Sequence, residues 1–384
     1  MRRFFCLVVL LGLFLGACSD ITQGVFYDIE TEISVPDNSL TDDIDVTRVV
    51  YLPAQTGALP PTSQPRYYIA GGAVFYREAP GTSDTDWHQI TAPGIVIDIA
   101  FIGPAGTQDI YAATERGLFC LPASNGYTVF ETRNYNTTGK QISRLMSLSG
   151  NLFVATFPEG LYYMDGTGAL LDTGLTGHRI LSGVHTTTGE YLFTSRSTHI
   201  FAANSPPSPG GWTTPPLATE QDIDTIVWPV GGSPVATNSG LAGGNISGEI
   251  RDIMETPSTP GTLYAVTTAG YVLRSTDSGA SWGYEYHGST FFSIAEINSV
   301  LVLGVDGSGL RHFLDPFDPA VPTKSRMEYP PGDFLKIPDL YNSSVFYLMT
   351  DTVSGSANWL LTGTNNGVWM ADYSNPAYVA WRHE

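Results

Sequence analysis

Hydrophobic and polar positions alternate along this chain in short runs, and the same arrangement of runs recurs from end to end. Residues 262–282 show it clearly: a short apolar strand and a polar turn lead to a second strand that begins at Gly270. Two short apolar segments separated by a glycine-containing turn are typical of a β-hairpin. The pattern therefore predicts an all-β protein built from one repeated unit.

The hairpin pattern occurs eight times, at 67–78, 110–121, 152–164, 191–203, 233–245, 263–275, 300–314 and 358–372. A further apolar segment precedes each hairpin, at 46–52, 96–102, 142–148, 178–184, 223–229, 250–256, 291–297 and 345–349. A fourth segment follows several hairpins, for example at 127–133 and 377–384. Each unit therefore has the material for a sheet of up to four strands.

Four short antiparallel strands that recur every ~40–45 residues are typical of propeller blades. One such sheet cannot bury both of its faces, whereas blades stacked around an axis cover both faces of every sheet. We therefore expect a single β-propeller over residues 46–384, with four-stranded antiparallel blades. Eight inner strands and eight hairpins predict eight blades. Seven is the alternative, because the fifth unit is short and the last interval carries a Pro-rich insertion near Pro330 and Pro331.

Composition fits this fold and excludes one class of partner. Charged residues make up 14% of the 384 residues, and 41 Gly and 26 Pro supply frequent turns. The formal net charge of −19 opposes binding to phosphate backbones, so nucleic acid is not an expected partner. The three cysteines are Cys6, Cys18 and Cys120, and Cys120 lies in an apolar strand that predicts a core position.

The first 18 residues have the pattern of an export signal. Arg2 and Arg3 precede an apolar stretch, residues 4–15, that is too short to span a bilayer. The sequence that follows, Leu-Gly-Ala-Cys18, resembles the lipobox of bacterial lipoproteins. The resemblance implies cleavage before Cys18, acylation of that cysteine and attachment to a membrane of the cell envelope. By the same resemblance, Ser19 favours the outer membrane.

Residues 19–45 carry eight acids and no Lys or Arg. A segment with charges of one sign repels itself and stays extended, which suits a spacer between a membrane and a folded domain. The predicted organisation is a signal peptide over 1–17, an acylated cysteine and acidic tether over 18–45, and the propeller over 46–384.

A second resemblance lies in the turn after the sixth hairpin. Ser275, Asp277, Gly279 and Trp282 follow the spacing S-x-D-x-G-x-x-W and resemble the Asp-box, or BNR repeat, of sialidases and other propellers. Asp277 is expected to accept hydrogen bonds from the amides of the turn, and Gly279 to adopt a positive φ. Trp282 is expected to cover the seam between blades. The resemblance implies a structural role for this turn, away from any catalytic face.

No motif for a metal, a nucleotide or a nucleophilic serine is present in a supporting context, so no cofactor is expected. Four arginines, Arg48, Arg144, Arg179 and Arg251, lie at the starts of predicted inner strands. In a propeller these starts surround one mouth of the central channel. The four side chains could therefore form an anion site that binds a carboxylate in bidentate fashion. The alternative is that each arginine pairs with an acid of a neighbouring blade.

Three functions fit these features. The first is a lipid-anchored, non-enzymatic module that binds an envelope protein or a glycan. The second is a sialidase-like glycoside hydrolase, which would need the four arginines in one pocket with a carboxylate and a tyrosine. The third is an outer-membrane assembly lipoprotein, similar to the eight-bladed component of the β-barrel assembly machinery. The sequence favours the first and leaves enzymatic activity open.

Overall fold

The apolar runs form short antiparallel strands in the computed structural model of the protein. The structure describes residues 44–54, 64–78, 86–104, 106–131, 135, 140–158, 160–164, 168–196, 199–203, 221–222, 226–227, 235–236, 248–279, 282–314, 326–332, 334–351, 359–375 and 377–383. All of these belong to one compact unit, residues 40–384. The predicted signal peptide, Cys18 and the tether up to residue 43 lie outside the described residues.

Among the described residues, the strands form seven sheets, six of four strands and one of three, and a separate two-stranded hairpin. The first three blades hold β1 (Arg48–Leu52), β2 (Arg66–Gly71), β3 (Ala73–Glu78) and β4 (His88–Ile90); β5 (Val96–Ile102), β6 (Asp109–Thr114) and β7 (Gly117–Leu121); and β8 (Gln141–Leu148), β9 (Asn151–Phe157), β10 (Gly160–Met164) and β11 (Leu170–Asp172). The fourth and fifth hold β12 (Ile180–His185), β13 (Tyr191–Ser195), β14 (His199–Ala203) and β15 (Gln221–Asp222); and β18 (Ile250–Glu255), β19 (Leu263–Thr267), β20 (Tyr271–Ser275) and β21 (Gly283–His287). The sixth and seventh hold β22 (Phe291–Ile297), β23 (Val300–Val305), β24 (Leu310–Leu314) and β25 (Arg326–Glu328); and β26 (Val345–Asp351), β27 (Trp359–Thr364), β28 (Gly367–Asp372) and β29 (Ala380–His383).

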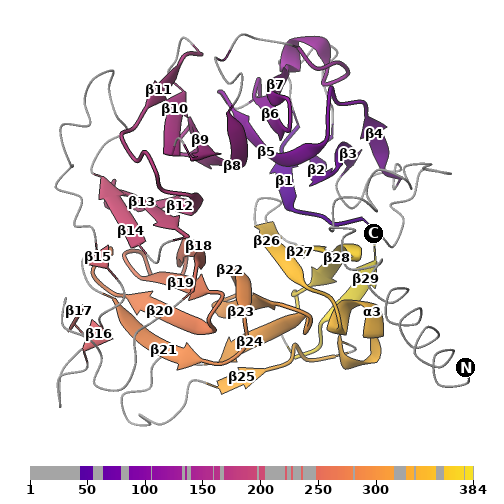
Figure 1. Cartoon of the computed structure of the whole chain (residues 1–384). Coiled ribbons are helices and arrows are strands. Elements are labelled where there is room, and N and C mark those ends of the chain that lie inside the picture. Colours follow the sequence, from indigo (N-terminus) through magenta and orange to yellow (C-terminus); the bar gives the residue numbers. More distant parts are fainter. Residues whose placement is uncertain are drawn as a thin grey trace, which may run out of the picture. The chain divides into compact units, whose positions relative to one another are not determined.

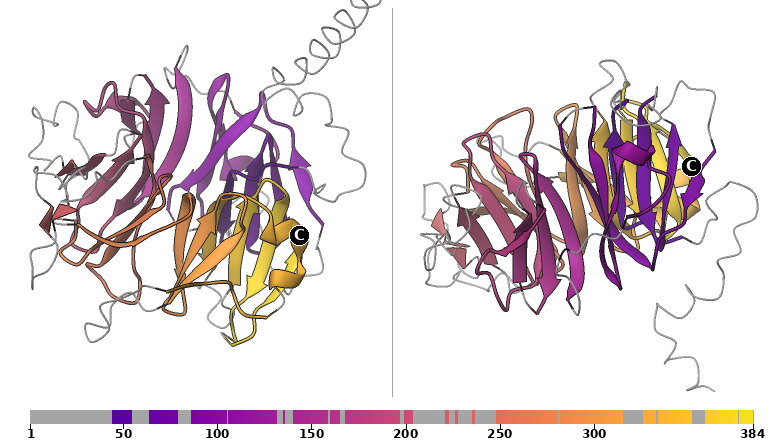
Figure 2. Two further views of the ribbon diagram at one scale, coloured as in Figure 1. Left: turned by 60° about the horizontal axis from the view of Figure 1, so that its bottom comes forward. Right: turned by 90° about the horizontal axis from the view of Figure 1, so that it is seen from above.

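The first strand of each blade lies nearest the centre of the ring (Figure 1). These inner strands contact one another in a closed circle, in the order β1, β5, β8, β12, β18, β22, β26 and back to β1. The two additional views show the sheets side by side around that circle (Figure 2). The predicted fold class, a single propeller of antiparallel blades, is confirmed, with seven blades.

The segment just before β1 closes the ring on the last blade. The Val46 amide donates to the Thr364 carbonyl at 2.8 Å, and the Gly367 amide donates to the Ile44 carbonyl at 3.0 Å. Residues 44–46 therefore join the first blade to the hairpin of the seventh blade.

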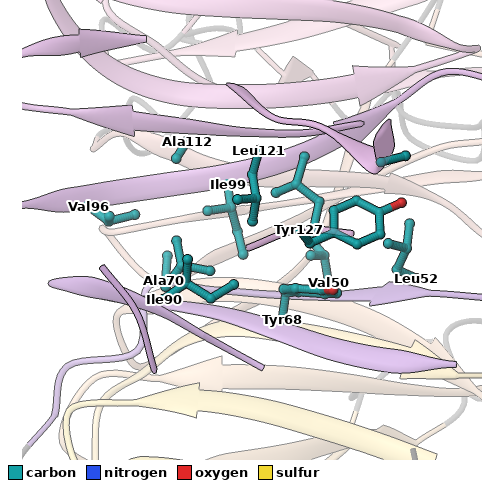
Figure 3. Close-up of a cluster of buried hydrophobic side chains, with 13 residues drawn as sticks. Val50, Leu52, Tyr68, Ala70, Ile90, Val96, Ile99, Ala112, Leu121 and Tyr127 are labelled. Atoms are coloured by element: carbon teal, nitrogen blue, oxygen red, sulfur yellow. The ribbon is translucent and has the colours of Figure 1, made fainter. Parts of the chain in front are cut away.

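Seven clusters of buried hydrophobic residues lie between the described blades, one at each junction of neighbouring blades. The cluster between the first two blades shows the arrangement: Val50 and Tyr68 of one sheet face Ile99 and Leu121 of the next (Figure 3). Fully burying one such aliphatic or aromatic side chain stabilises the fold by about 1.5–3 kcal/mol. No blade is covered without its neighbours, which is why the repeat forms a ring.

The described residues of the fifth predicted unit form a two-stranded hairpin and no blade. Its described parts are β16 (Ile226–Val227) and β17 (Val235–Ala236), which pair only with each other. The circle of inner strands passes directly from β12 to β18. The second strand predicted for this unit, in residues 233–245, is rich in glycine and lacks the aromatic residues that other blades bury. The count is therefore seven, the alternative, rather than eight.

Two blades depart from the regular pattern. In the second, the predicted fourth strand at 127–133 is represented by a single bridge between Cys120 and Glu131. Cys120 is fully buried, as its apolar strand predicted. Before the seventh blade, the Pro-rich insertion forms a 3-10 helix η2 (Phe334–Lys336) and a short α3 (Pro338–Tyr341), whose Phe334 and Leu340 are fully buried.

The glycine that starts the second strand of a hairpin also permits close packing of the next blade. Gly160 and Gly270 adopt φ values of 102° and 89°, which L side chains rarely adopt. A β-carbon on Gly160 would overlap the Leu175 carbonyl, and one on Gly270 would overlap the Gly288 carbonyl. Both carbonyls lie in segments that lead into the following blade, so these glycines set the spacing between blades.

Candidate functional site at the propeller axis

A fully or almost fully buried apolar residue lies at or within two residues of the start of each inner strand: Val46, Val96, Ile142, Ile180, Ile250, Phe291 and Val345. In six strands the hydrogen-bond register then slips by one residue, a β-bulge. In the first blade the described pairing begins at Arg48, and Thr47 is the residue equivalent to the bulge residue of the other six. The residue two positions after the buried apolar residue is therefore equivalent in all seven blades. We call these seven the axial residues: Arg48, Asp98, Arg144, Ser182, Asp252, Ser293 and Tyr347.

Asp98 connects the first three blades. Its Oδ1 accepts hydrogen bonds from Arg48 Nε at 2.7 Å and from the Ile99 amide at 2.9 Å. Its Oδ2 accepts from Arg48 Nη2 at 3.0 Å and from the Leu145 amide at 2.7 Å. Burial alone would raise the pKa of this carboxyl. The Arg48 and Arg144 guanidiniums and the hydrogen bonds outweigh burial and hold the pKa below its usual value.

Arg48 reaches beyond its neighbouring blade. Its Nη2 donates to the Leu145 carbonyl of the third blade at 2.9 Å, and its guanidinium lies 4.5 Å from the ring centre of Tyr347 in the seventh. Burial alone would lower the pKa of Arg48, but the Asp98 carboxylate, followed by Tyr347, more than reverses this and the pKa is raised. Arg48 is therefore a permanent cation, fixed by partners in the second and third blades and by the Tyr347 ring of the seventh.

Asp252 repeats this arrangement on the other side of the ring. Its Oδ1 accepts from Ser182 Oγ at 2.7 Å and from the Ile253 amide at 3.0 Å, and its Oδ2 accepts from the Ile294 amide at 3.1 Å. In both cases the carboxylate of one blade accepts a hydrogen bond from a backbone amide of the next blade, that of the residue immediately after its axial residue. Ser293 continues the series by donating to the Val345 carbonyl at 3.2 Å.

Arg144 differs from the other charged axial residues. Its Nε lies 3.7 Å from Asp98 Oδ2, which is an ion-pair distance but not a hydrogen bond. That Nε is buried and makes no hydrogen bond. Burial, followed by the repulsion of Arg48, lowers the pKa of Arg144. A buried guanidinium nitrogen without a hydrogen bond is energetically costly, so this residue requires an explanation.

The remaining two predicted arginines have other contacts. Arg251 occupies the bulge position beside Asp252, donates to Glu249 Oε2 at 3.2 Å and lies 5.2 Å from the Phe292 ring centre. Arg179 immediately precedes β12, and its guanidinium lies 6.0 Å from the ring centre of Phe157. The structure thus brings Arg48 and Arg144 to one carboxylate, whereas Arg179 and Arg251 contact other groups.

The turn that resembles an Asp-box lies between β20 and β21. Ser275 Oγ donates to Asp277 Oδ1 at 2.7 Å and accepts from the Gly279 amide at 2.9 Å, and Gly279 has a φ of 96°. Trp282 is fully buried, donates from Nε1 to the Gly279 carbonyl at 3.1 Å and packs in the cluster that includes Leu192 of the fourth blade. Because this turn follows the third strand of its blade, it lies at the opposite end from the axial residues.

Sequence reasoning missed Asp98, Asp252, Tyr347, Ser182 and Ser293. The inner strands can be aligned by their first buried apolar residue, and all five then fall in one column with Arg48 and Arg144. That alignment is the signal that would have found them.

Within the described part of the chain, no group of three or more His, Cys, Asp or Glu side chains is placed to hold a metal. No helix among the described residues has the length and apolar content to cross a membrane.

Comparison with known proteins supports the fold. No protein-family profile and no curated protein sequence matches the chain. One similar solved structure is the extracellular domain of a B. thetaiotaomicron protein described as a hybrid two-component system. The TM-score is 0.58 and the sequence identity 15%, and the match covers 87% of this chain and 39% of the B. thetaiotaomicron chain. Another is PorZ, a surface component of the type-IX secretion system of Porphyromonas gingivalis, with a TM-score of 0.53 and 10% identity over 90% of this chain and 39% of that one.

The WD40 propeller domain of Doa1 has a TM-score of 0.52 and 10% identity, over 90% of this chain and 95% of that domain. At these identities the likeness shows the fold alone. The chain spans 39% of the length of the B. thetaiotaomicron and PorZ chains.

Proposed function

We propose that this protein is a lipid-anchored β-propeller of the bacterial cell envelope and that it serves as a non-enzymatic binding scaffold. The observation that carries the proposal is the closed seven-bladed ring, a fold shared with an extracellular domain and with a bacterial surface component. The lipobox-like sequence that ends at Cys18 supports attachment to a membrane, and the acidic segment after it would serve as the spacer.

The chemistry of Asp98 fits a structural role rather than proton donation. A glycosidase needs a carboxylic acid whose pKa is raised so that it can donate a proton. The pKa of Asp98 is instead lowered, and each of its two oxygens already accepts two hydrogen bonds. Asp98 is therefore suited to fix the blades, and it is unsuited to act as a general acid.

Lipid attachment is tested by metabolic labelling with a palmitate analogue in a Gram-negative host. We expect label in the wild-type chain and none in a Cys18→Ser variant. Two variants serve as controls and should keep the label. Cys6→Ser changes a residue of the predicted leader, and Cys120→Ala changes the buried core cysteine. Label that persists in Cys18→Ser would refute the anchor.

The binding role is tested by affinity purification of the tagged full-length chain from detergent-solubilised membranes of its native host, after cross-linking. We expect one stoichiometric envelope protein or glycan, recovered in repeated preparations. The same purified chain is assayed for hydrolysis of a fluorogenic sialoside. Turnover above the level of a heat-denatured sample would overturn the non-enzymatic assignment.

A further inference from the structure

We propose that Arg144 is the anion-binding group of a ligand site at the propeller axis, and that the ligand presents a singly charged carboxylate. This deepens the proposed binding function, on which it rests, by assigning the chemistry of a ligand. The argument depends on a surplus of hydrogen-bond donors among the axial residues.

The acceptor capacity of Asp98 is already used. An ionised carboxylate offers about four lone-pair positions, and Asp98 fills all four with two bonds from Arg48 and the amides of Ile99 and Leu145. Arg144 approaches the same carboxylate at 3.7 Å and finds no free position. The pairing of Arg48 with Asp98 is therefore complete without Arg144.

Arg144 keeps donors that no described partner uses. Its Nε is buried without a hydrogen bond, while 20% of its side chain remains exposed, against 1% for Asp98. A guanidinium carries five N–H donors in a planar fork that fits a carboxylate in bidentate fashion. Polar groups that a fold leaves unsatisfied commonly belong to functional sites. The buried Nε itself cannot reach a ligand, so an anion would bind at the two Nη groups, for which no hydrogen bond to a described residue is found.

The surrounding charges select the kind of anion. Arg48 acts on Arg144 as a like charge, while the carboxylates of Asp98 and Asp252 both act on it as opposite charges. Two cations and two carboxylates together have no net charge, so each negative charge that a ligand adds stays uncompensated, and a doubly charged phosphate is disfavoured more than a singly charged group. A carboxylate with one negative charge pairs with Arg144 without adding a second charge. The Tyr347 ring, 6.0 Å from Arg144, supplies a flat face at the same place.

The test uses the full-length protein, purified in dodecyl maltoside in a buffer free of carboxylates. N-acetylphenylalanine, which imitates a chain terminus, and glucuronate, which imitates an acidic sugar, are titrated by calorimetry. Their neutral counterparts, N-acetylphenylalaninamide and glucose, and inorganic phosphate are titrated in parallel. We expect at least one carboxylate to bind and its neutral counterpart and phosphate to bind at least tenfold more weakly. Which carboxylate binds more tightly identifies the source of the ligand.

Variants of Arg144 then assign the site. Arg144→Met should weaken carboxylate binding at least tenfold, and Arg144→Lys, which keeps the charge but loses the fork, should weaken it less. Arg116→Gln removes a positive charge at a side chain that is 71% exposed, and it should bind as the wild type does. Failure of every carboxylate to bind the wild type, or equal binding by Arg144→Met, would overturn the proposal.

A second readout separates binding from a structural role. Without ligand, Arg144→Met should melt at the same temperature as the wild type or higher, because an apolar side chain replaces a desolvated cation that makes no hydrogen bond. A lower melting temperature with unchanged carboxylate binding would assign Arg144 to the framework and refute the site. The titration does not depend on acylation, so a Cys18→Ser chain should bind carboxylate normally even if the proposed anchor is wrong.

Discussion

Replacing Asp98 with asparagine keeps the size of the side chain but removes the negative charge that faces Arg48 and Arg144. The amide group of asparagine cannot accept the hydrogen bonds that one carboxylate oxygen now accepts. Arg48 is 12% exposed and Arg144 is 20% exposed, so water can screen neither guanidinium effectively. The variant therefore leaves two largely buried cations close together without a counter-charge.

The expected cost follows from that geometry. Removing one partner of a buried ion pair destabilises a protein by about 3–5 kcal/mol. With an unfolding entropy of about 2.1 cal/mol/K per residue over residues 40–384, the whole unit has about 0.7 kcal/mol/K. The melting temperature of Asp98→Asn should therefore fall by about 4–7 °C, measured by tryptophan fluorescence during heating.

Asp252→Asn is the matched control. Asp252 occupies the equivalent position and accepts two amides and Ser182, but no arginine donates to it. Its replacement should cost only about 1–3 kcal/mol, the range for losing hydrogen bonds to a charged acceptor. The double variant Arg48→Met, Asp98→Asn should recover part of the loss, because one uncompensated cation is gone. Equal decreases in Asp98→Asn and Asp252→Asn would refute the reasoning.

Three further predictions concern stability. His312 is buried against Tyr373, and burial lowers its pKa from 6.5 to about 4, so between these pH values the unfolded chain binds a proton that the folded chain does not. The free energy of unfolding, measured by urea titration, should therefore fall by about 3 kcal/mol as the pH falls from 6.5 to 4. His312→Gln should remove most of this pH dependence. Gly160→Ala should lower the free energy of unfolding, measured by thermal denaturation, by about 2–4 kcal/mol, and the control Gly150→Ala by about 1 kcal/mol. Both glycines have a positive φ, but only at Gly160 would a β-carbon overlap another backbone segment. Trp282→Ala should cost about 3–5 kcal/mol in the same assay, since its ring fills the junction of two blades; a loss below 1 kcal/mol would contradict that role.

The architecture was predictable because each blade repeats the same local pattern. The predicted inner strands at 96–102 and 291–297 coincide with β5 and β22, and the hairpin glycines fall where the chain turns. The blade count was not settled by pattern alone, because a hairpin-like sequence forms a blade only if it can fill two junctions with buried side chains. Residues 233–245 have the turn but lack the large apolar side chains, and their described part, β17, pairs only with β16.

The sequence predicted only some of the axial residues, because it did not show in which register each inner strand presents its side chains. The sequence places Arg48, Arg144, Arg179 and Arg251 near the starts of inner strands, but a strand start is a position along the chain and not a direction of the side chain. Counted from the first buried apolar residue, Arg48 and Arg144 come two positions later, Arg251 one position later and Arg179 one position earlier. The bulge at this point makes each of those offsets face a different environment. Aligned in this way, the sequence would have predicted that Arg48 and Arg144 flank Asp98, so that two guanidiniums face one carboxylate.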